Sequence, residues 1–100
     1  MKPQTISMKM QEYVQGFREQ LAKEDWASIA TLTENTGAFF RELIQELPES
    51  GTVGQEVEFF IACVDRFGTA CRQKDMEKAA QTLAEMERVL ESVQSQYDFA

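Results

Sequence analysis

Residues 48–54 read Pro48-Glu49-Ser50-Gly51-Thr52-Val53-Gly54 and lie at the middle of this 100-residue chain. Proline lacks the N–H donor of a helical turn, and its ring clashes with the turn before it. Gly51 and Gly54 permit backbone angles that interrupt a helix. Apolar residues recur at helical spacing on both sides of this stretch. The sequence therefore predicts two helical halves, residues 5–47 and 53–97, joined by a loop at residues 48–54.

The first half is predicted to contain two amphipathic helices separated by the short link Lys23-Glu24-Asp25. The first helix is expected to begin at Thr5 or Ser7, and Asp25 is a suitable N-cap for the second. Gly37 weakens the second helix, so a break there stays open, but the apolar pattern remains in phase across it. The expected stripes are Ile6, Met10, Tyr13, Val14, Phe17 and Leu21, then Trp26, Ile29, Leu32, Phe39, Phe40, Leu43, Ile44 and Leu47.

The second half repeats this plan with helices near residues 53–72 and 76–97, separated by Gln73-Lys74-Asp75. The expected stripes are Val57, Phe60, Ile61, Val64, Phe67 and Cys71, then Met76, Ala79, Leu83, Met86, Val89, Leu90, Val93 and Tyr97. Short links place consecutive helices side by side and antiparallel. No segment alternates with the period of two that a strand requires. The predicted fold class is therefore all-α: one domain, residues 1–100, folded as an antiparallel up-down-up-down four-helix bundle made of two helical hairpins.

The two halves correspond at an offset of fifty residues. Asp25 aligns with Asp75, and Phe17 aligns with Phe67. Literal identities are few, and any two helical hairpins of equal length would share this phase. A duplication and an independent origin of the halves both stay open, and the predicted architecture is the same in either case.

Composition excludes several classes of function. The net charge is −7, which disfavours direct binding to nucleic acid and docking on an anionic membrane. The chain contains no histidine, which removes histidine metal ligands, general bases and phosphoacceptors. No phosphate-binding or nucleophile motif is present. We therefore expect a protein that is not an enzyme and binds no cofactor or metal.

The two cysteines, Cys63 and Cys71, lie in one predicted helix. Eight helical residues separate them by about 12 Å along the axis, which is too far for a disulfide between them. They are interpreted as reduced and buried, which fits a cytoplasmic protein. The first residues lack the apolar block of a signal peptide, and no apolar run is long enough to span a membrane.

An acidic cluster surrounds the predicted loop. Residues 25–58 contain seven carboxylates and a single arginine. Glu42, Glu46 and Glu49 sit at helical neighbour spacing, and Glu56 and Glu58 follow the loop. Their mutual repulsion favours the approach of a basic partner. The alternative is an acidic pole that is solvated and serves only solubility.

A second candidate surface is apolar. The apolar stripes of the second and third helices are broad. Leu32 and Phe39 lie at one edge of the stripe of the second helix, and Phe59 and Cys63 lie at one edge of the stripe of the third. Because these helices are predicted neighbours, the four residues are candidates for one patch that binds an amphipathic helix of another protein. The alternative is a wide core stripe. The function favoured is a small acidic protein-binding module, with a structural homodimer and an acidic inhibitor or nucleic-acid mimic as alternatives.

The stretch Leu21-Ala22-Lys23-Glu24-Asp25-Trp26-Ala27-Ser28-Ile29-Ala30-Thr31-Leu32 resembles the first turn and second helix of FliT-type flagellar export chaperones. Those small, helical, often acidic proteins commonly open a helix with an Asp-Trp or similar pair. The threonine-rich middle of the second helix and the double-phenylalanine pairs depart from that pattern. The resemblance implies a cytoplasmic chaperone that binds a helical segment of an export substrate.

Overall fold

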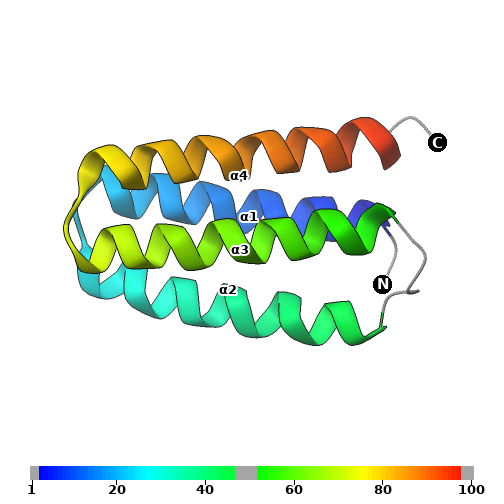
Figure 1. Cartoon of the computed structure of the whole chain (residues 1–100), viewed down its shortest axis with the longest axis horizontal. Coiled ribbons are helices and arrows are strands. Elements are labelled where there is room, and N and C mark those ends of the chain that lie inside the picture. The colour runs from blue at the N-terminus through cyan, green and yellow to red at the C-terminus, as the bar shows by residue number, and fades with distance from the viewer. Residues whose placement is uncertain (1–2, 47–51, 98–100) are drawn as a thin grey trace.

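The computed structural model describes residues 3–46 and 52–97, which form four helices (Figure 1). These helices are α1 (Pro3–Ala22), α2 (Trp26–Glu46), α3 (Thr52–Arg72) and α4 (Met76–Tyr97). Within the described ranges no residue belongs to a strand, so the predicted all-α class is confirmed. Side chains are described for residues 6–46 and 54–95.

The four helices lie lengthwise around one core. Helix α1 packs against α2 and α4, and α3 packs against the same two helices. Figure 1 shows both three-residue links at one end of the molecule and both chain termini at the other. The molecule measures 38 × 24 × 17 Å. Four pairs of helices are therefore neighbours, α1–α2, α2–α3, α3–α4 and α1–α4, and the surface along which each pair meets is called a seam.

The core is aromatic along its centre, as the helical spacing predicts. Phe17, Phe40, Phe60 and Phe67 are all fully buried. The rings of Phe17 and Phe67 lie 4.9 Å apart, and those of Phe40 and Phe60 lie 5.1 Å apart. Each helix therefore contributes to the core part of the apolar stripe expected of it, whereas Met76, predicted for the stripe of α4, is exposed. The other buried apolar residues include Ile6, Met10, Val14, Ile29, Leu43, Val57, Val64, Ala79, Met86 and Val93.

The two links have nearly the same backbone geometry. Glu24 and Lys74 take φ of 54° and 56°, in the left-handed region. The next N–H in each link, of Asp25 or Asp75, donates to a carbonyl five residues earlier, at 3.1 and 2.9 Å. This pattern ends a helix as a Schellman motif does. Each aspartate then caps the following helix, because its Oδ1 accepts a hydrogen bond from the N–H three residues later.

The structure corrects two predicted boundaries. Helix α3 begins at Thr52, so residues 52–54 of the predicted loop are helical. Gly54 lies in the first turn, where backbone N–H groups lack intrahelical partners in any case, and a glycine interrupts little there. Helix α1 begins at Pro3 rather than at Thr5 or Ser7, because the fixed φ of proline suits a first turn. Residues 48–51 lie outside the described ranges.

Helix α2 continues through Gly37, as the in-phase apolar pattern predicts. Gly37 and Thr36 are both buried. The Thr36 hydroxyl donates to the carbonyl oxygen of Leu32 at 2.6 Å, so its polar group is satisfied within the helix. The threonine-rich middle of α2 is thus held by packing despite its weak helix propensity.

Candidate functional site

The predicted apolar patch does not form as one surface. Leu32 and Phe39 are half-buried on the side of α2 that faces α1. The Phe39 ring lies 5.9 Å from the ring of Tyr13 in α1. Leu32 Cδ2 approaches Gly16 so closely that a Cβ built there would lie 3.1 Å away. These two predicted site residues therefore belong to the α1–α2 seam.

The other two predicted residues lie toward α4. Phe59 is 52% exposed beside α4, whereas Cys63 is fully buried. The Cys63 thiol accepts a hydrogen bond from Arg66 at 3.5 Å and lies 3.9 Å from Glu85 of α4. Helical spacing shows how wide a stripe is, but it leaves open which neighbour each edge of the stripe faces. That is why the expected patch across α2 and α3 is wrong.

The α2–α3 seam itself is polar. Arg41 of α2 pairs with Asp65 of α3 at 3.1 Å. Near this pair the Thr33 side chain packs against Gly68, at ordinary contact distance from where a Cβ would lie. Exposed ion pairs contribute little to stability, about 0–1 kcal/mol. This pair nevertheless crosses the seam where the patch was predicted.

Four of the five acidic candidates, Glu42, Glu46, Glu56 and Glu58, lie toward the end of the molecule where α2 ends and α3 begins. Glu42 and Glu46 are exposed on the last turns of α2, and Glu49 lies outside the described residues. Glu56 is half-buried and accepts a hydrogen bond from the Ser92 hydroxyl of α4 at 3.2 Å. Glu58 is exposed. Binding of a basic partner by these carboxylates stays a prediction.

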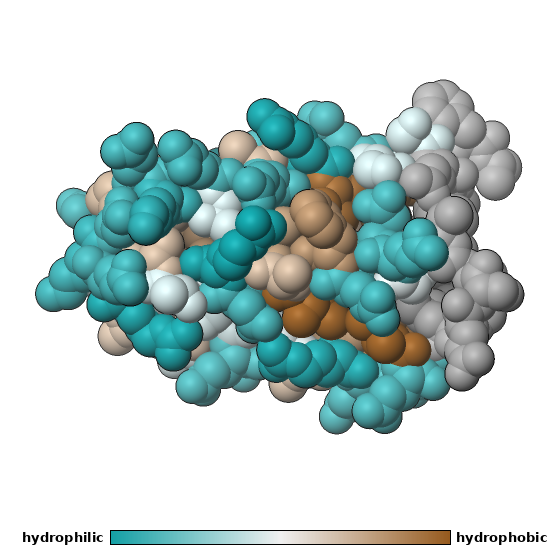
Figure 2. Space-filling model, in the orientation of Figure 1, coloured by the Kyte–Doolittle hydropathy of each residue, from teal (hydrophilic) through white to brown (hydrophobic). Residues whose placement is uncertain are grey.

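The α3–α4 seam contains a hollow around Phe59. The hollow has a volume of about 340 Å³. Figure 2 shows apolar side chains gathered over the half of the molecule nearer the chain termini, with polar side chains around them. Phe59 is one of three exposed large apolar residues in the described ranges, with Met8 and Met76. The hollow is lined by Gln55, Glu56, Phe59, Arg88, Val89 and Ser92.

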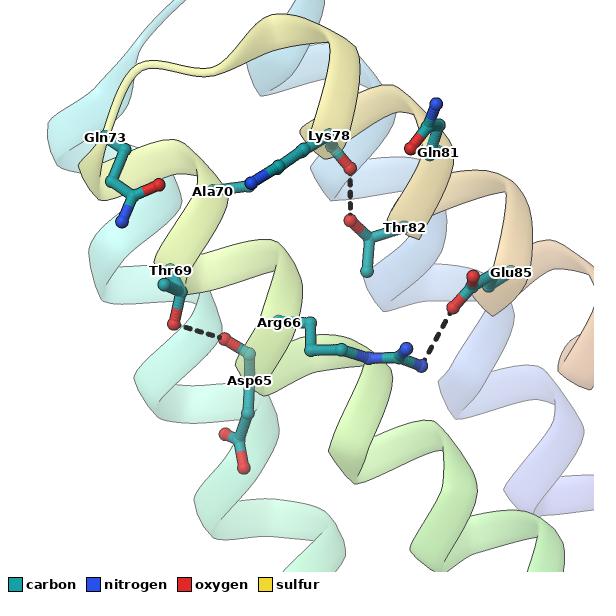
Figure 3. A pocket seen from close by; sticks show the side chains of 9 residues that line it. All are labelled: Asp65, Arg66, Thr69, Ala70, Gln73, Lys78, Gln81, Thr82 and Glu85. Carbon is teal, nitrogen blue, oxygen red and sulfur yellow. Dashed lines mark hydrogen bonds and ion pairs between the residues drawn. The ribbon is translucent and has the colours of Figure 1, made fainter.

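A second hollow, of about 510 Å³, lies on the same seam next to the Gln73–Asp75 link (Figure 3). Arg66 of α3 and Glu85 of α4 form an ion pair across it at 2.8 Å. Figure 3 shows the Lys78 side chain extending from α4 toward α3. Two basic residues, Arg66 and Lys78, and two acidic residues, Asp65 and Glu85, line this hollow, so its net charge is close to zero.

The two hollows share one face of each helix. Phe59 and Arg66 are spaced by seven residues in α3, and Glu85 and Ser92 are spaced by seven in α4. Residues seven apart lie nearly above one another on a helix. The two hollows therefore lie in line along the α3–α4 seam and are together named the α3–α4 groove, which the Arg66–Glu85 ion pair crosses. Apolar spacing alone did not identify Arg66, Glu85 or Arg88, although Arg66 lies seven residues after Phe59 and could have been placed by that relation.

The two cysteine thiols, of Cys63 and Cys71, are free and buried. Burial raises the pKa of the Cys71 thiol to about 11. Burial also raises the pKa of Cys63, although the hydrogen bond from Arg66 opposes this. Both thiols are therefore protonated and weakly nucleophilic near neutral pH. Residues 3–46 and 52–97 contain no cluster of three or more metal-ligating side chains.

The described part of the chain contains no helix that is long and apolar enough to cross a membrane. Comparison with known protein families, with curated proteins and with solved structures finds no match to this chain.

Proposed function

We propose that this protein is a non-enzymatic binding module that holds a helical segment of a partner protein in the α3–α4 groove. The observation that carries this proposal is the exposure of Phe59, which is 52% exposed within a hollow instead of buried. Covering apolar surface is favourable by about 25 cal/mol per Å². A groove between two helices accepts the side-chain ridge of a third helix.

The other seams are less suited to this role. The hollow of the α2–α3 seam, beside the Arg41–Asp65 pair, measures only about 190 Å³ and is lined by no exposed large apolar side chain of the described ranges. The α1–α2 seam has a hollow of about 400 Å³ beside its link, but none of the exposed large apolar side chains of the described residues lines it. Its large apolar residue, Leu32, is already half-buried against Gly16. Phe59 therefore remains the best apolar anchor.

The wider proposal concerns architecture and setting. We infer an up-down-up-down bundle of two hairpins, since three-residue links join α1 to α2 and α3 to α4. The resemblance around residues 21–32 gives the binding module a specific form, a small acidic cytoplasmic adaptor or export chaperone. In the structure that stretch is the first link and the start of α2, away from the α3–α4 groove.

Site-specific photo-cross-linking in the native cell tests this function. A photoreactive side chain at position 59 should give a discrete cross-linked partner that mass spectrometry identifies. Met8, which is 62% exposed on α1, is the matched control position and should not give that product. Cross-linking of the same proteins from both positions would contradict a specific site at Phe59.

The identified partner then permits a quantitative test. Phe59→Glu should weaken its binding at least tenfold, while the helical circular dichroism spectrum is retained. Met8→Glu should leave the affinity unchanged. Equal affinities for the two variants would show that Phe59 is not the anchor.

The homodimer is a second candidate, because a second copy could cover the same exposed Phe59. Sedimentation equilibrium at micromolar concentration separates the two functions. A monomer is expected for the binding module. A dimer that Phe59→Glu dissociates, with the helical spectrum retained, would favour the structural homodimer instead.

A further inference from the structure

The α3–α4 groove is long enough for several turns of a bound helix. Its lining begins at Gln55 in α3 and ends at Gln73, the first residue of the link after α3. Eighteen residues of helix span about 27 Å. Phe59 and Arg66, one in each hollow, are separated by seven residues, or about 10 Å along the axis. An occupant can therefore place one side chain in each hollow, two turns apart.

The two hollows differ in charge. Near Phe59, Glu56 lines the hollow, and exposed Glu58 and Glu91 each adjoin a lining residue in the sequence. Arg88 is the single basic residue that lines this hollow. Neither Glu58 nor Glu91 forms an ion pair with another described residue. The apolar end of the groove is thus the acidic end.

The second hollow is close to neutral. Arg66 is paired with Glu85 at 2.8 Å, and Lys78 faces the same space (Figure 3). Asp65 is already paired with Arg41 of α2. A basic side chain of a partner would therefore be attracted more strongly beside Phe59 than beside Arg66, because Glu58 and Glu91 form no ion pair with another described residue.

We propose that the groove binds a basic amphipathic helix of another protein, with an apolar side chain on Phe59 and Val89 and basic side chains beside Glu56, Glu58 and Glu91. This inference rests on the proposed function and specifies the partner for the same site. A second copy is a poorer occupant, since each chain has a net charge of −7 and would bring acidic surface against acidic surface.

Three synthetic 18-residue peptides of defined chemistry test the partner class. The first is an amphipathic helix with a leucine face flanked by lysines. The second keeps the leucines and replaces every lysine by glutamate, and the third scrambles the first so that no apolar face remains. Titration calorimetry with the full chain should show the first peptide binding at least tenfold more tightly than either of the others, with an affinity that falls as salt rises.

Protein variants locate the binding. Phe59→Ser should lower the affinity for the first peptide at least tenfold. Met8→Ser, which changes an exposed methionine of α1, should leave that affinity unchanged. The double change Glu58→Gln with Glu91→Gln should weaken it about three- to tenfold. The matched control, Glu19→Gln with Glu34→Gln, removes the same charge from exposed positions of α1 and α2 and should have little effect.

The outcomes separate this inference from the proposed function. If the lysine and glutamate peptides bind equally and both depend on Phe59, the groove binds helices but the basic partner is wrong. If the two double variants weaken binding equally, only the overall charge matters and the inference is overturned. If Phe59→Ser changes nothing for any peptide, the groove is not the site and both proposals fail.

Discussion

The α1–α2 and α3–α4 seams begin in the same way and then differ. Each follows a three-residue link with a left-handed residue, Glu24 or Lys74, and an aspartate cap. Each has a hollow beside that link, of about 400 and 510 Å³. Farther from the link, Tyr13 and Phe39 pack their rings together in the first seam. At the equivalent height of the second seam, Phe59 is exposed beside a hollow.

The difference follows from side-chain volume at positions fifty residues apart. Tyr13 and Phe39 of the first seam correspond to Cys63 and Val89 of the second. Val89 lines the hollow beside Phe59, whereas the larger ring of Phe39 packs against Tyr13 in the first seam. Matching backbone turns therefore do not make matching surfaces, because the size of a few side chains decides whether a seam is filled or grooved.

The largest expected effect tests whether the two halves contribute equally to the core. Phe17→Ala and Phe67→Ala should each lower the free energy of unfolding by about 3–5 kcal/mol, since both rings are fully buried. Their rings touch, so the double variant should lose less than the sum of the single losses. Urea denaturation measures all three. A loss below about 1 kcal/mol for either single change would contradict its place in the core.

A smaller effect tests the close approach in the first seam. Gly16→Val should lower the free energy of unfolding by about 1–3 kcal/mol, because even a Cβ would lie 3.1 Å from Leu32 Cδ2. Gly68→Ala is the matched control, since its Cβ would meet Thr33 at an ordinary 3.5 Å. That change should instead stabilise the helix by up to about 1 kcal/mol. Thermal denaturation measures the stability of both variants. A Gly16→Val variant as stable as the native protein would show that the α1–α2 seam has room for the valine side chain.

The caps distinguish the two links. Asp75→Ala should lower the free energy of unfolding by about 1 kcal/mol, the usual cost of losing an N-cap. Asp25→Ala should cost more, because Asp25 also accepts a hydrogen bond from the Ser28 hydroxyl at 2.8 Å. Urea denaturation at pH 7 checks the order. Equal losses would mean that the extra hydrogen bond contributes nothing.

The same hydrogen bonds make the Asp25 cap sensitive to acid. The hydroxyl and N–H of Ser28 hold the pKa of Asp25 below its ordinary value of 3.8. Its contribution to stability is therefore present above pH 3.8 and is lost as the pH falls through the lowered pKa. The stability difference between the native protein and Asp25→Ala should shrink over that range.

The smallest expected effect is a gain at both links. Glu24→Gly and Lys74→Gly should each raise the free energy of unfolding by about 0.5–1 kcal/mol, because glycine accepts a left-handed conformation that costs an L-residue more. The φ values of 54° and 56° predict similar gains. Thermal denaturation provides the test, and a loss of stability in either variant would show that its side chain contributes more than the backbone strain costs.

Local sequence signals predicted most of the fold. The apolar spacing placed Phe17, Phe40, Phe60 and Phe67 in the core, and Asp25 and Asp75 as caps. These predictions succeed because helix periodicity and capping depend on residues within one or two turns. The beginning of α3 was predicted less well, since a glycine in a first turn interrupts little.

The candidate site was only half predicted. Phe59 was singled out from its phase on the helix, and the structure finds it exposed. The surface around it was assigned to α2, but it belongs to α4, with Arg88 and Val89 beside Phe59. Spacing along one helix contains no information about which neighbour its edges will meet. The groove residues of α4 could therefore not be joined to Phe59 before the packing was known.

The sequence by itself determined four helices, the positions of two links, the buried aromatic stripe and an acidic chain of net charge −7. These depend on local spacing, propensity and composition. Only the tertiary structure decided that Leu32 faces α1, that Arg41 crosses to Asp65, and that Phe59 opens onto a groove beside α4. These depend on how far each helix turns about its axis when it packs, and that rotation is set by the volumes of side chains distant in the sequence.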